Sequence, residues 1–361
     1  MDVETKLELI QRVGEEIITK RELKELLNTK EHPVAYDGFE PSGLAHIPFG
    51  IYRAINLEDL IKAGIKFKLL IADWHAWING KMGGDLERIR RVGEYFIEVW
   101  RAAGVDMERV EVVWASELTS LQEYWKKVIL VAKHTTLNRA IRCLTIMGRT
   151  KVELRETAQL FYPMMQNADI FQLEADICQL GLDQKRANML AREVGPKLGW
   201  WKPVVISHHM LMGLDGVKAP EGYDESQGID IQISSKMSKS KPMTCLYVHD
   251  TEGEIKQKIL SAFCPEKIVD GNPILEYCKY IIFRKNDTFV IERPSKYGGD
   301  VEIEGYEELE KLYRVGGIHP LDLKHATARE LNEIILPVRR HFETGKAKKL
   351  YDFVKGEKVT R

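Results

Sequence analysis

The feature that most constrains the fold is an alternation of short apolar runs with longer amphipathic stretches. Residues 67–72, 110–114 and 204–206 are apolar runs with the length of buried strands, and residues 85–103 carry apolar side chains at helical spacing. Strands that alternate with helices favour a parallel sheet covered by helices, because each parallel connection must cross over the sheet. The sequence therefore predicts an α/β fold with a Rossmann-like parallel sheet.

The N-terminal region is predicted to be helical. From Leu7 to Leu27, apolar side chains recur at the spacing of a helix face, and the pattern ends at Pro33, where proline breaks it. We therefore expect residues 1–33 to form an N-terminal helical segment ahead of the sheet.

The sheet domain is expected to span residues 34–235, with a helical insertion around residues 118–170. Residues 121–147 and 158–191 have helical spacing, and we interpret them as an insertion and return helices rather than as further strands. Residues 236–361 are predicted to form a mostly helical C-terminal domain.

Two local signals lie in this C-terminal domain. Thr251-Glu252-Gly253-Glu254 is a capping box, in which the Thr251 hydroxyl caps a helix start and the Glu254 carboxylate reaches back to the cap. Residues 289–292 and 300–303 read as short strands on either side of a turn-rich link, which predicts one β-hairpin among the helices.

Composition excludes several classes of protein. The 361 residues are 44% hydrophobic and 30% charged, as in a globular protein of about two domains. No apolar run is long enough to suggest a membrane span, and residues 1–6 lack the pattern of a secretory signal, so we expect a cytoplasmic protein with no membrane partner. The five cysteines lack disulfide or metal-site spacing, and no metal site is predicted.

Charge is nearly balanced over the chain but uneven at its end. A formal net charge of −1 argues against a protein that coats nucleic acid indiscriminately, although it allows a local basic face. Residues 339–361 contain eight lysines and arginines against three acidic residues. Such a run is often only a solvated helix end, and it could equally supply phosphate contacts.

A glycine-rich turn stands where the first strand of the sheet should pass into the first helix. It reads Tyr36-Asp37-Gly38-Phe39-Glu40-Pro41-Ser42-Gly43 and is followed by His46-Ile47-Pro48-Phe49-Gly50. In a doubly wound sheet, ligands bind beyond the carboxyl ends of the strands, where a helix N-terminus offers N–H groups to phosphate. His46 can donate to a phosphate oxygen, although a lone histidine at such a place is more often a surface residue.

A second motif, Lys236-Met237-Ser238-Lys239-Ser240, lies far downstream. A lone lysine loop is usually a solvated turn, but the pairing with the glycine-rich turn resembles the two signatures of class I aminoacyl-tRNA synthetases. Further segments resemble tyrosyl-tRNA synthetases of the archaeal and eukaryotic type, from about Tyr36 to Phe342. These segments are Phe39-Glu40-Pro41-Ser42-Gly43, Ala72-Asp73-Trp74-His75-Ala76-Trp77, Tyr162-Pro163-Met164-Met165-Gln166, Asp183-Gln184-Lys185-Arg186 and His319-Pro320-Leu321-Asp322-Leu323-Lys324.

The resemblance implies a tyrosine–tRNA ligase. Tyrosine would react with ATP, carried in with Mg²⁺, to give tyrosyl-adenylate, and the tyrosyl group would pass to the 3′-terminal ribose of tRNA(Tyr). No tightly bound cofactor is implied, and family members are homodimers. The implied catalytic residues are His46, Lys236 and Lys239.

The resemblance also implies the residues that bind each substrate. Asp73 and His75 would lie beside the tyrosine site, and anticodon reading would fall to the C-terminal domain. Tyrosine would be bound by Tyr36, Tyr162, Gln166, Asp169 and Gln184; ATP by Gly38, Ser42, His46, Asp183, Met210, Leu211, Lys236 and Lys239; and tRNA by Lys185, Arg186, His319 and Asp322.

Spacing supports part of the tyrosine pocket independently. Tyr162, Gln166 and Asp169 are four and then three residues apart, so one helix face presents all three to one cavity. Apolar neighbours such as Met164 and Met165 argue against a helix face in water. The prediction that His319 and Asp322 bind tRNA has less support, because His319-Pro320 with Asp322 could simply begin a helix.

One departure and two alternatives remain at this stage. The first signature usually reads HIGH in class I synthetases, whereas this chain has Pro48 and Phe49 at its last two positions, which puts a phosphate-binding role for position 49 in doubt. A tryptophanyl-tRNA synthetase shares the same fold and lysine loop, but the polar pair Tyr36 and Asp169 favours a phenol over an indole. A synthetase-like protein that binds RNA without catalysis is the more distant alternative, and the intact lysine loop argues against it.

Overall fold

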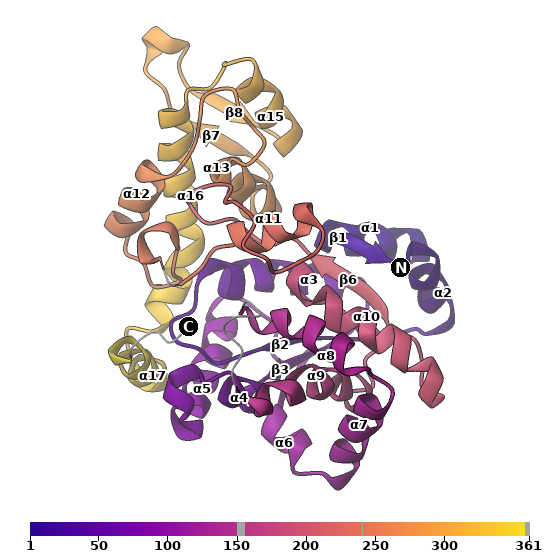
Figure 1. Cartoon of the computed structure of the whole chain (residues 1–361). Helices are drawn as coiled ribbons and strands as arrows, with labels where there is room; N and C mark the ends of the chain where they lie inside the picture. The colour runs from indigo at the N-terminus through magenta and orange to yellow at the C-terminus, as the bar shows by residue number, and fades with distance from the viewer. Residues whose placement is uncertain (150–155, 240, 358–361) are drawn as a thin grey trace.

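The computed structural model describes residues 1–149, 156–239 and 241–357. Ser240 of the lysine loop, residues 150–155 of the predicted insertion and the last four residues lie outside the described part. Figure 1 shows a sheet domain flanked by helices, with most of the C-terminal elements gathered at one end of it and helix α17 returning beside α5.

A six-stranded sheet forms the centre of the larger domain, in the order β1-β6-β5-β2-β3-β4. β1 pairs antiparallel with β6, and the other neighbours are parallel. The chain adds strands on one side of β2 and later on its other side, so the strand order reverses between β2 and β5, which is where doubly wound sheets bind ligands. The strands are β1 (Gly14–Ile18), β2 (Val34–Phe39), β3 (Lys66–Ile71), β4 (Val110–Trp114), β5 (Ile177–Cys178) and β6 (Val204–His208).

Helices cover the sheet and make up most of the C-terminal domain. The helices up to the lysine loop are α1 (Val3–Val13), α2 (Lys20–Thr29), α3 (Arg53–Lys62), α4 (Asp73–Ile78), α5 (Leu86–Ala102), α6 (Ala115–Thr119), α7 (Gln122–Lys133), α8 (Leu137–Cys143), α9 (Phe161–Gln172), α10 (Lys185–Val194) and α11 (Gln227–Ser235). Those after it are α12 (Glu252–Ser261), α13 (Pro273–Tyr277), α14 (Phe283–Lys285), α15 (Tyr306–Arg314), α16 (Pro320–His341) and α17 (Gly345–Gly356).

Several predicted elements are confirmed. The strands predicted at 67–72, 110–114 and 204–206 are β3, β4 and β6, and the helix predicted at 85–103 is α5, whose N-cap Asp85 accepts from two backbone N–H groups. The capping box at Thr251 is present at the start of α12. The predicted hairpin consists of β7 (Phe289–Ile291) and β8 (Val301–Ile303), paired antiparallel.

Two strands were missed. The prediction that the N-terminal segment is wholly helical is wrong at β1, where Ile17 pairs with Ile206 on the sheet edge. The prediction that residues 158–191 contain no strand is wrong at β5, which is only two residues long and lies between β2 and β6. Both segments are too short to show a period of their own, and both are held by hydrogen bonds to neighbours that are distant in sequence.

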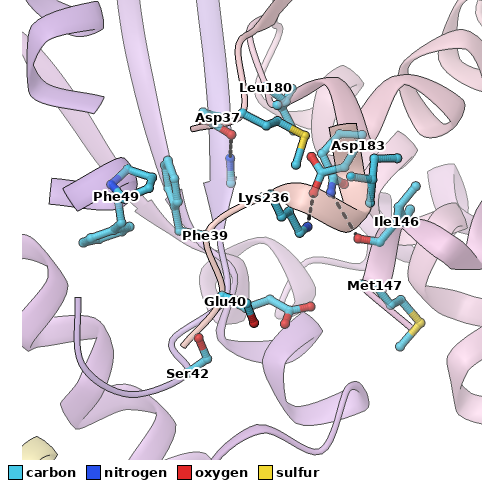
Figure 2. A pocket seen from close by; sticks show the side chains of 18 of the residues that line it. Asp37, Phe39, Glu40, Ser42, Phe49, Ile146, Met147, Leu180, Asp183 and Lys236 are labelled. Carbon is cyan, nitrogen blue, oxygen red and sulfur yellow. Dashed lines mark hydrogen bonds and ion pairs between the residues drawn. The ribbon is translucent and has the colours of Figure 1, made fainter. Parts of the chain in front are cut away.

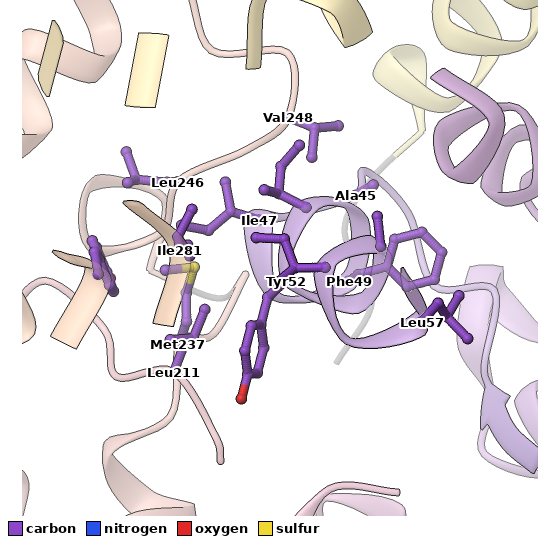
Figure 3. Packing of buried hydrophobic residues seen from close by; sticks show 14 of the residues in the cluster. Ala45, Ile47, Phe49, Tyr52, Leu57, Leu211, Met237, Leu246, Val248 and Ile281 are labelled. Atoms are coloured by element: carbon purple, nitrogen blue, oxygen red, sulfur yellow. The ribbon is translucent and has the colours of Figure 1, made fainter. Parts of the chain in front are cut away.

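A single hydrophobic cluster continues from the sheet domain into the C-terminal helices. Ile47 and Tyr52, which follow the glycine-rich turn, belong to it together with Val248 and Ile281 from beyond the lysine loop (Figure 3). The segment that carries His46 is therefore packed directly against the C-terminal part of the chain. The domain boundary at residue 236 stays a prediction.

Candidate active site

A cleft of about 490 Å³ opens at the carboxyl ends of the parallel strands. The end of β2 and the turn after it form one wall, and the residues after β5 and β6, together with the lysine loop, form another (Figure 2). All the residues predicted to bind tyrosine and ATP line this one cleft. The topological switch between β2 and β5 places them there, although most are distant from one another in sequence.

The end of the cleft at α9 contains a buried polar network around Asp169. The Tyr124 hydroxyl donates to Asp169 Oδ1 at 2.8 Å, and His75 Nε2 lies 3.1 Å from Asp169 Oδ2. Burial alone would lower the pKa of His75, but the contact with Asp169 and the further negative charges of Glu40 and Asp73 together raise that pKa above its ordinary value. Asp169 is thus held in place from two sides, as a fixed acceptor.

Tyr36, on β2, faces the same region. Its side chain is 1% exposed, and its hydroxyl forms no hydrogen bond with the described residues. Burial raises the pKa of Tyr36 well above its ordinary value, and the nearby Cys178 and Asp169 act in the same direction. A buried hydroxyl without a partner is costly, so this group is poised to bond a polar group of a ligand.

Two further polar contacts complete this end. The Tyr162 hydroxyl donates to Glu40 Oε1 at 2.6 Å, and Gln166 Nε2 donates to Gln184 Oε1 at 3.2 Å. Tyr162, Gln166 and Asp169 lie on one face of α9 and all three line the cleft, which confirms the geometry expected from their spacing.

The other end of the cleft is built from loops and positive charge. Lys239 Nζ donates to Ser42 Oγ in the glycine-rich turn at 2.9 Å. Burial lowers the pKa of Lys239 to about 8. His46 is neutral at neutral pH, because burial and then the charge of Lys239 lower its pKa to about 3, and its Nδ1 is buried without a partner among the described residues.

Lys236 lies on the opposite wall of this end and forms an ion pair with Asp183, with Nζ and Oδ2 2.7 Å apart (Figure 2). The segment before Lys236 is held to the strand-end loop that contains Met210 and Leu211. Met212 and Lys236 form an antiparallel bridge, and Met237 N–H donates to the Leu211 carbonyl at 2.8 Å. The two lysines of the loop therefore reach opposite walls of the same space.

The departure at Pro48 and Phe49 has a packing explanation. Pro48 occupies the first position of a short π-helix, Pro48–Tyr52, where its missing N–H costs nothing. The Phe49 ring packs against Phe96 and Trp100 at centroid distances of 4.1 and 4.8 Å and also against Phe39. Position 49 thus contributes an aromatic wall to the cleft rather than a polar group.

A buried ion pair beneath the cleft was missed from the sequence. Arg53 on α3 is 2% exposed and pairs with Asp37 at 2.6 Å, and it also bonds the Gln179 side chain after β5. Burial raises the pKa of Asp37 to about 7 against the opposing charge of Arg53. The pair ties α3 to the ends of β2 and β5, on the two sides of the switch point.

Other residues that shape the cleft also went unassigned. Nothing in the sequence distinguishes Tyr124 from the apolar face of α7 around it, and Glu40 carries no signal beyond its place in the Phe39–Gly43 motif. Asp73 was expected beside the tyrosine site, but it is buried outside the cleft lining, where its carboxylate accepts from Trp74 and Ser116 N–H groups. A buried polar residue gives no signal in sequence until its partner is known.

The residues predicted to contact tRNA lie outside the cleft. Lys185 and Arg186, at the start of α10, form ion pairs with Glu16 and Asp224. His319 is the exposed N-cap of α16, with Nδ1 accepting from Leu321 N–H, and Asp322 lies in the first turn of that helix. The helix-start geometry expected from the sequence is confirmed, and the roles of these four residues stay predictions.

The described residues lack two kinds of feature, a metal-binding cluster and a membrane-spanning helix. They contain no group of three or more histidine, cysteine, aspartate or glutamate side chains that could hold a metal ion. None of the helices in the described ranges is long and apolar enough to cross a membrane.

The cleft lies at the switch point of the sheet and is lined by His46 and by both lysines of the loop, which is the arrangement expected of a class I aminoacyl-tRNA synthetase. The model of the family "tRNA synthetases class I (W and Y)" matches residues 28–221 and 230–335. The chain therefore belongs to this family of tryptophan and tyrosine enzymes.

The relatives place it in the tyrosine branch. It is 45% identical to tyrosine–tRNA ligase 1, cytoplasmic, of Arabidopsis thaliana, over 100% of this chain and 90% of that protein. It is 48% identical to the tyrosine–tRNA ligase of Sulfurisphaera tokodaii, over 95% of this chain and 94% of that protein. The structure of tyrosyl-tRNA synthetase from Pyrococcus horikoshii, complexed with L-tyrosine, matches with a TM-score of 0.89 and 39% identity, over 98% of this chain and 100% of that one.

Proposed function

We propose that the cleft performs both steps of tyrosine–tRNA ligation with the residues described above. The chain is a class I aminoacyl-tRNA ligase for tyrosine. In the first step, the tyrosine carboxylate attacks the α-phosphate of ATP, forming tyrosyl-adenylate and releasing pyrophosphate. In the second step, a 3′-terminal ribose hydroxyl of tRNA(Tyr) takes the tyrosyl group and AMP leaves.

Tyrosine recognition is assigned to the end of the cleft at α9. The substrate phenol would donate to Asp169 and accept from the unpaired Tyr36 hydroxyl. Phenylalanine would leave the buried Tyr36 hydroxyl without a partner and would give Asp169 no donor beyond Tyr124 and His75, and tyrosine enzymes are themselves the standard example of selectivity obtained in this way. The side-chain oxygens of Tyr162, Gln166 and Gln184 would then face the substrate's ammonium group, which needs acceptors.

ATP is assigned to the loop-built end. Gly38 and Ser42 would lie along the nucleotide, Asp183 would meet its ribose, and the backbone of Met210 and Leu211 would meet its adenine. His46, Lys236 and Lys239 would stabilise the charge that develops between the α- and β-phosphates. ATP would arrive as its Mg²⁺ complex, and every step assigned to this chain is one of binding, orienting or charge stabilisation.

Transfer RNA would span both domains. Lys185 and Arg186 would contact the acceptor end near the cleft. His319 and Asp322 would meet the anticodon at the far end of the C-terminal domain, where exposed Val315 and Leu321 offer apolar surface for bases. The basic run after Arg339 would add phosphate contacts that do not depend on sequence.

We also propose a homodimer, as the family resemblance implies, and a cytoplasmic location, which the name of the Arabidopsis relative supports. On the helical face of residues 121–131, Val128 and Val131 are buried in the core, Trp125 packs against it, and Leu121 is exposed. Large exposed side chains nevertheless gather in this stretch, including Ile129 and Leu137 at 59% and 63% exposure. Ile129→Asp should shift a dimer to monomer in light scattering, and an unchanged mass would move the interface elsewhere.

The observation that carries the proposed function is one cleft that joins the Asp169–Tyr36 pair to both loop lysines. The test is exchange of labelled pyrophosphate into ATP with tyrosine, tryptophan or phenylalanine. Exchange with tyrosine alone is expected. Exchange with tryptophan would overturn the pocket assignment, and no exchange with any of the three would favour the RNA-binding alternative.

A further inference from the structure

Lys236 owes its place to a short ladder between two loops. Met212, after β6, pairs antiparallel with Lys236, while Gly213 N–H donates to the Ser235 carbonyl at 2.9 Å. Leu211 and Met237 are both buried in the hydrophobic cluster that also contains Ile281 (Figure 3). The position of the Met212 peptide therefore sets the register of the first loop lysine.

Two consecutive residues of the C-terminal domain hold that peptide from both sides. Met212 N–H donates to Glu276 Oε1 at 2.6 Å, and the Tyr277 hydroxyl donates to the Met212 carbonyl at 2.6 Å. Both residues belong to α13, and Tyr277 is fully buried. A backbone unit bonded in this way cannot slide along the loop without leaving buried polar groups unpaired.

The Glu276 carboxylate is itself fixed by His209. His209 Nε2 lies 2.8 Å from Glu276 Oε1, and its Nδ1 lies 3.0 Å from Glu15 on β1. The His209 ring stacks on Tyr280 at 4.2 Å with an interplanar angle of 8°. Burial opposes a charge here, but the ion pairs with Glu15 and Glu276 raise the pKa of His209 to about 9, so the histidine stays protonated at neutral pH.

We propose that Glu276 and Tyr277 are positioning residues for the adenylation step, which hold Lys236 in register through the Met212 peptide. The consequence is that the C-terminal domain contributes to amino-acid activation in the absence of tRNA. This inference rests on the proposed function, because it concerns the lysine that acts on ATP.

The test uses the full chain and tyrosine-dependent pyrophosphate exchange, an assay that contains no tRNA. Tyr277→Phe removes the hydroxyl that holds the Met212 carbonyl, and Glu276→Leu removes the acceptor of the Met212 N–H. Each is expected to lower kcat/KM for ATP about tenfold, because a misplaced catalytic group loses transition-state contact. Tyrosine affinity, measured by direct binding, should stay within about twofold of the unmodified chain.

Two variants separate positioning from stability. Glu276→Gln keeps an acceptor oxygen for Met212 N–H and should restore most of the activity lost in Glu276→Leu. Tyr313→Phe removes the hydroxyl of another fully buried tyrosine, which lies outside the cleft lining and donates to the Pro265 carbonyl at 2.9 Å, and should lower thermal stability without lowering exchange.

The outcomes are distinct. Exchange within about twofold of the unmodified chain in both Tyr277→Phe and Glu276→Leu would overturn the inference, as would an equal loss in Tyr313→Phe at equal melting temperature. If the unmodified chain itself shows no exchange with tyrosine, the proposed function fails instead.

Discussion

The two ends of the cleft are built differently. The tyrosine end lies on regular elements, β2 and α9, and most of its polar side chains already have partners, as Asp169 has in Tyr124 and Gln166 has in Gln184. The ATP end lies on loops, and its charged groups make contacts that a nucleotide must replace, such as Lys236 with Asp183 and Lys239 with Ser42. One end is therefore preformed, and the other must rearrange.

This difference follows from what each end has to do. Telling tyrosine from phenylalanine requires buried acceptors and donors at fixed positions, because the discrimination is the cost of leaving them unpaired. Stabilising a reacting triphosphate requires positive charge aimed at the charge that develops, and side chains on loops can leave their present partners and close on the nucleotide once it is bound. Mutations at the two ends should accordingly separate binding from catalysis.

The largest effect is expected from Lys236→Ala. Loss of this charge should slow adenylate formation in a single turnover by roughly 100- to 1,000-fold, since it acts on charge that develops in the transition state. Tyrosine binding should be unchanged, because the tyrosine end does not depend on the loop. Lys256→Ala, on the exposed face of α12, is the matched control, and an unaltered single-turnover rate in Lys236→Ala would refute the assignment.

Asp169→Asn should impair the recognition of tyrosine, whereas Lys236→Ala should impair the reaction with ATP. The variant keeps the shape of the site but removes the charged acceptor, so kcat/KM for tyrosine should fall by roughly 10- to 100-fold, as for a hydrogen bond to a charged group. The kcat/KM for phenylalanine should fall less, so the ratio of the two kcat/KM values, which measures the preference for tyrosine, should decrease. Competition between the two amino acids in pyrophosphate exchange measures this directly, and an undiminished preference would count against the pocket.

The pH dependence of kcat/KM for ATP should reflect the protonation of Lys239 at the ATP end of the cleft. The pKa of Lys239 is lowered by burial to about 8, so without ATP its ammonium loses its proton as the pH rises through that value. Because bound phosphate favours the charged form, kcat/KM for ATP should fall about tenfold per pH unit above that pKa. The arginine of Lys239→Arg stays protonated, so kcat/KM for ATP should no longer fall with rising pH. The same fall in that variant would mean that another group causes the pH dependence.

The smallest effect is expected from Tyr124→Phe. This change removes one donor to Asp169 and leaves the carboxylate and His75 in place. The loss should be about 1 kcal/mol, as for one net hydrogen bond, and should be seen in tyrosine affinity but not in the rate at saturating tyrosine. Isothermal titration with tyrosine is the measurement, and a larger loss than in Asp169→Asn would mean that Tyr124 orders the whole pocket.

The sequence predicted the long, periodic elements and the signature motifs well. The spacing of apolar residues predicts helix α5 and the strands at 66–71 and 110–114. The face of α9 that holds Tyr162 and Asp169 follows from helical geometry. β1 and β5 were missed because short strands are stabilised by neighbours rather than by their own residues.

The sequence by itself determined the α/β class, the family and a set of candidate residues for tyrosine and ATP that all line the cleft, because these depend on local spacing and on motifs that can be read along the chain. Only the tertiary structure decided which of those groups are already paired. The contacts of Asp169 with Tyr124 and His75, of Arg53 with Asp37, and of Met212 with Glu276 and Tyr277 join segments far apart in the chain. A buried polar group acquires its charge state and its role from its partner, and that partner is chosen by the packing of the whole fold.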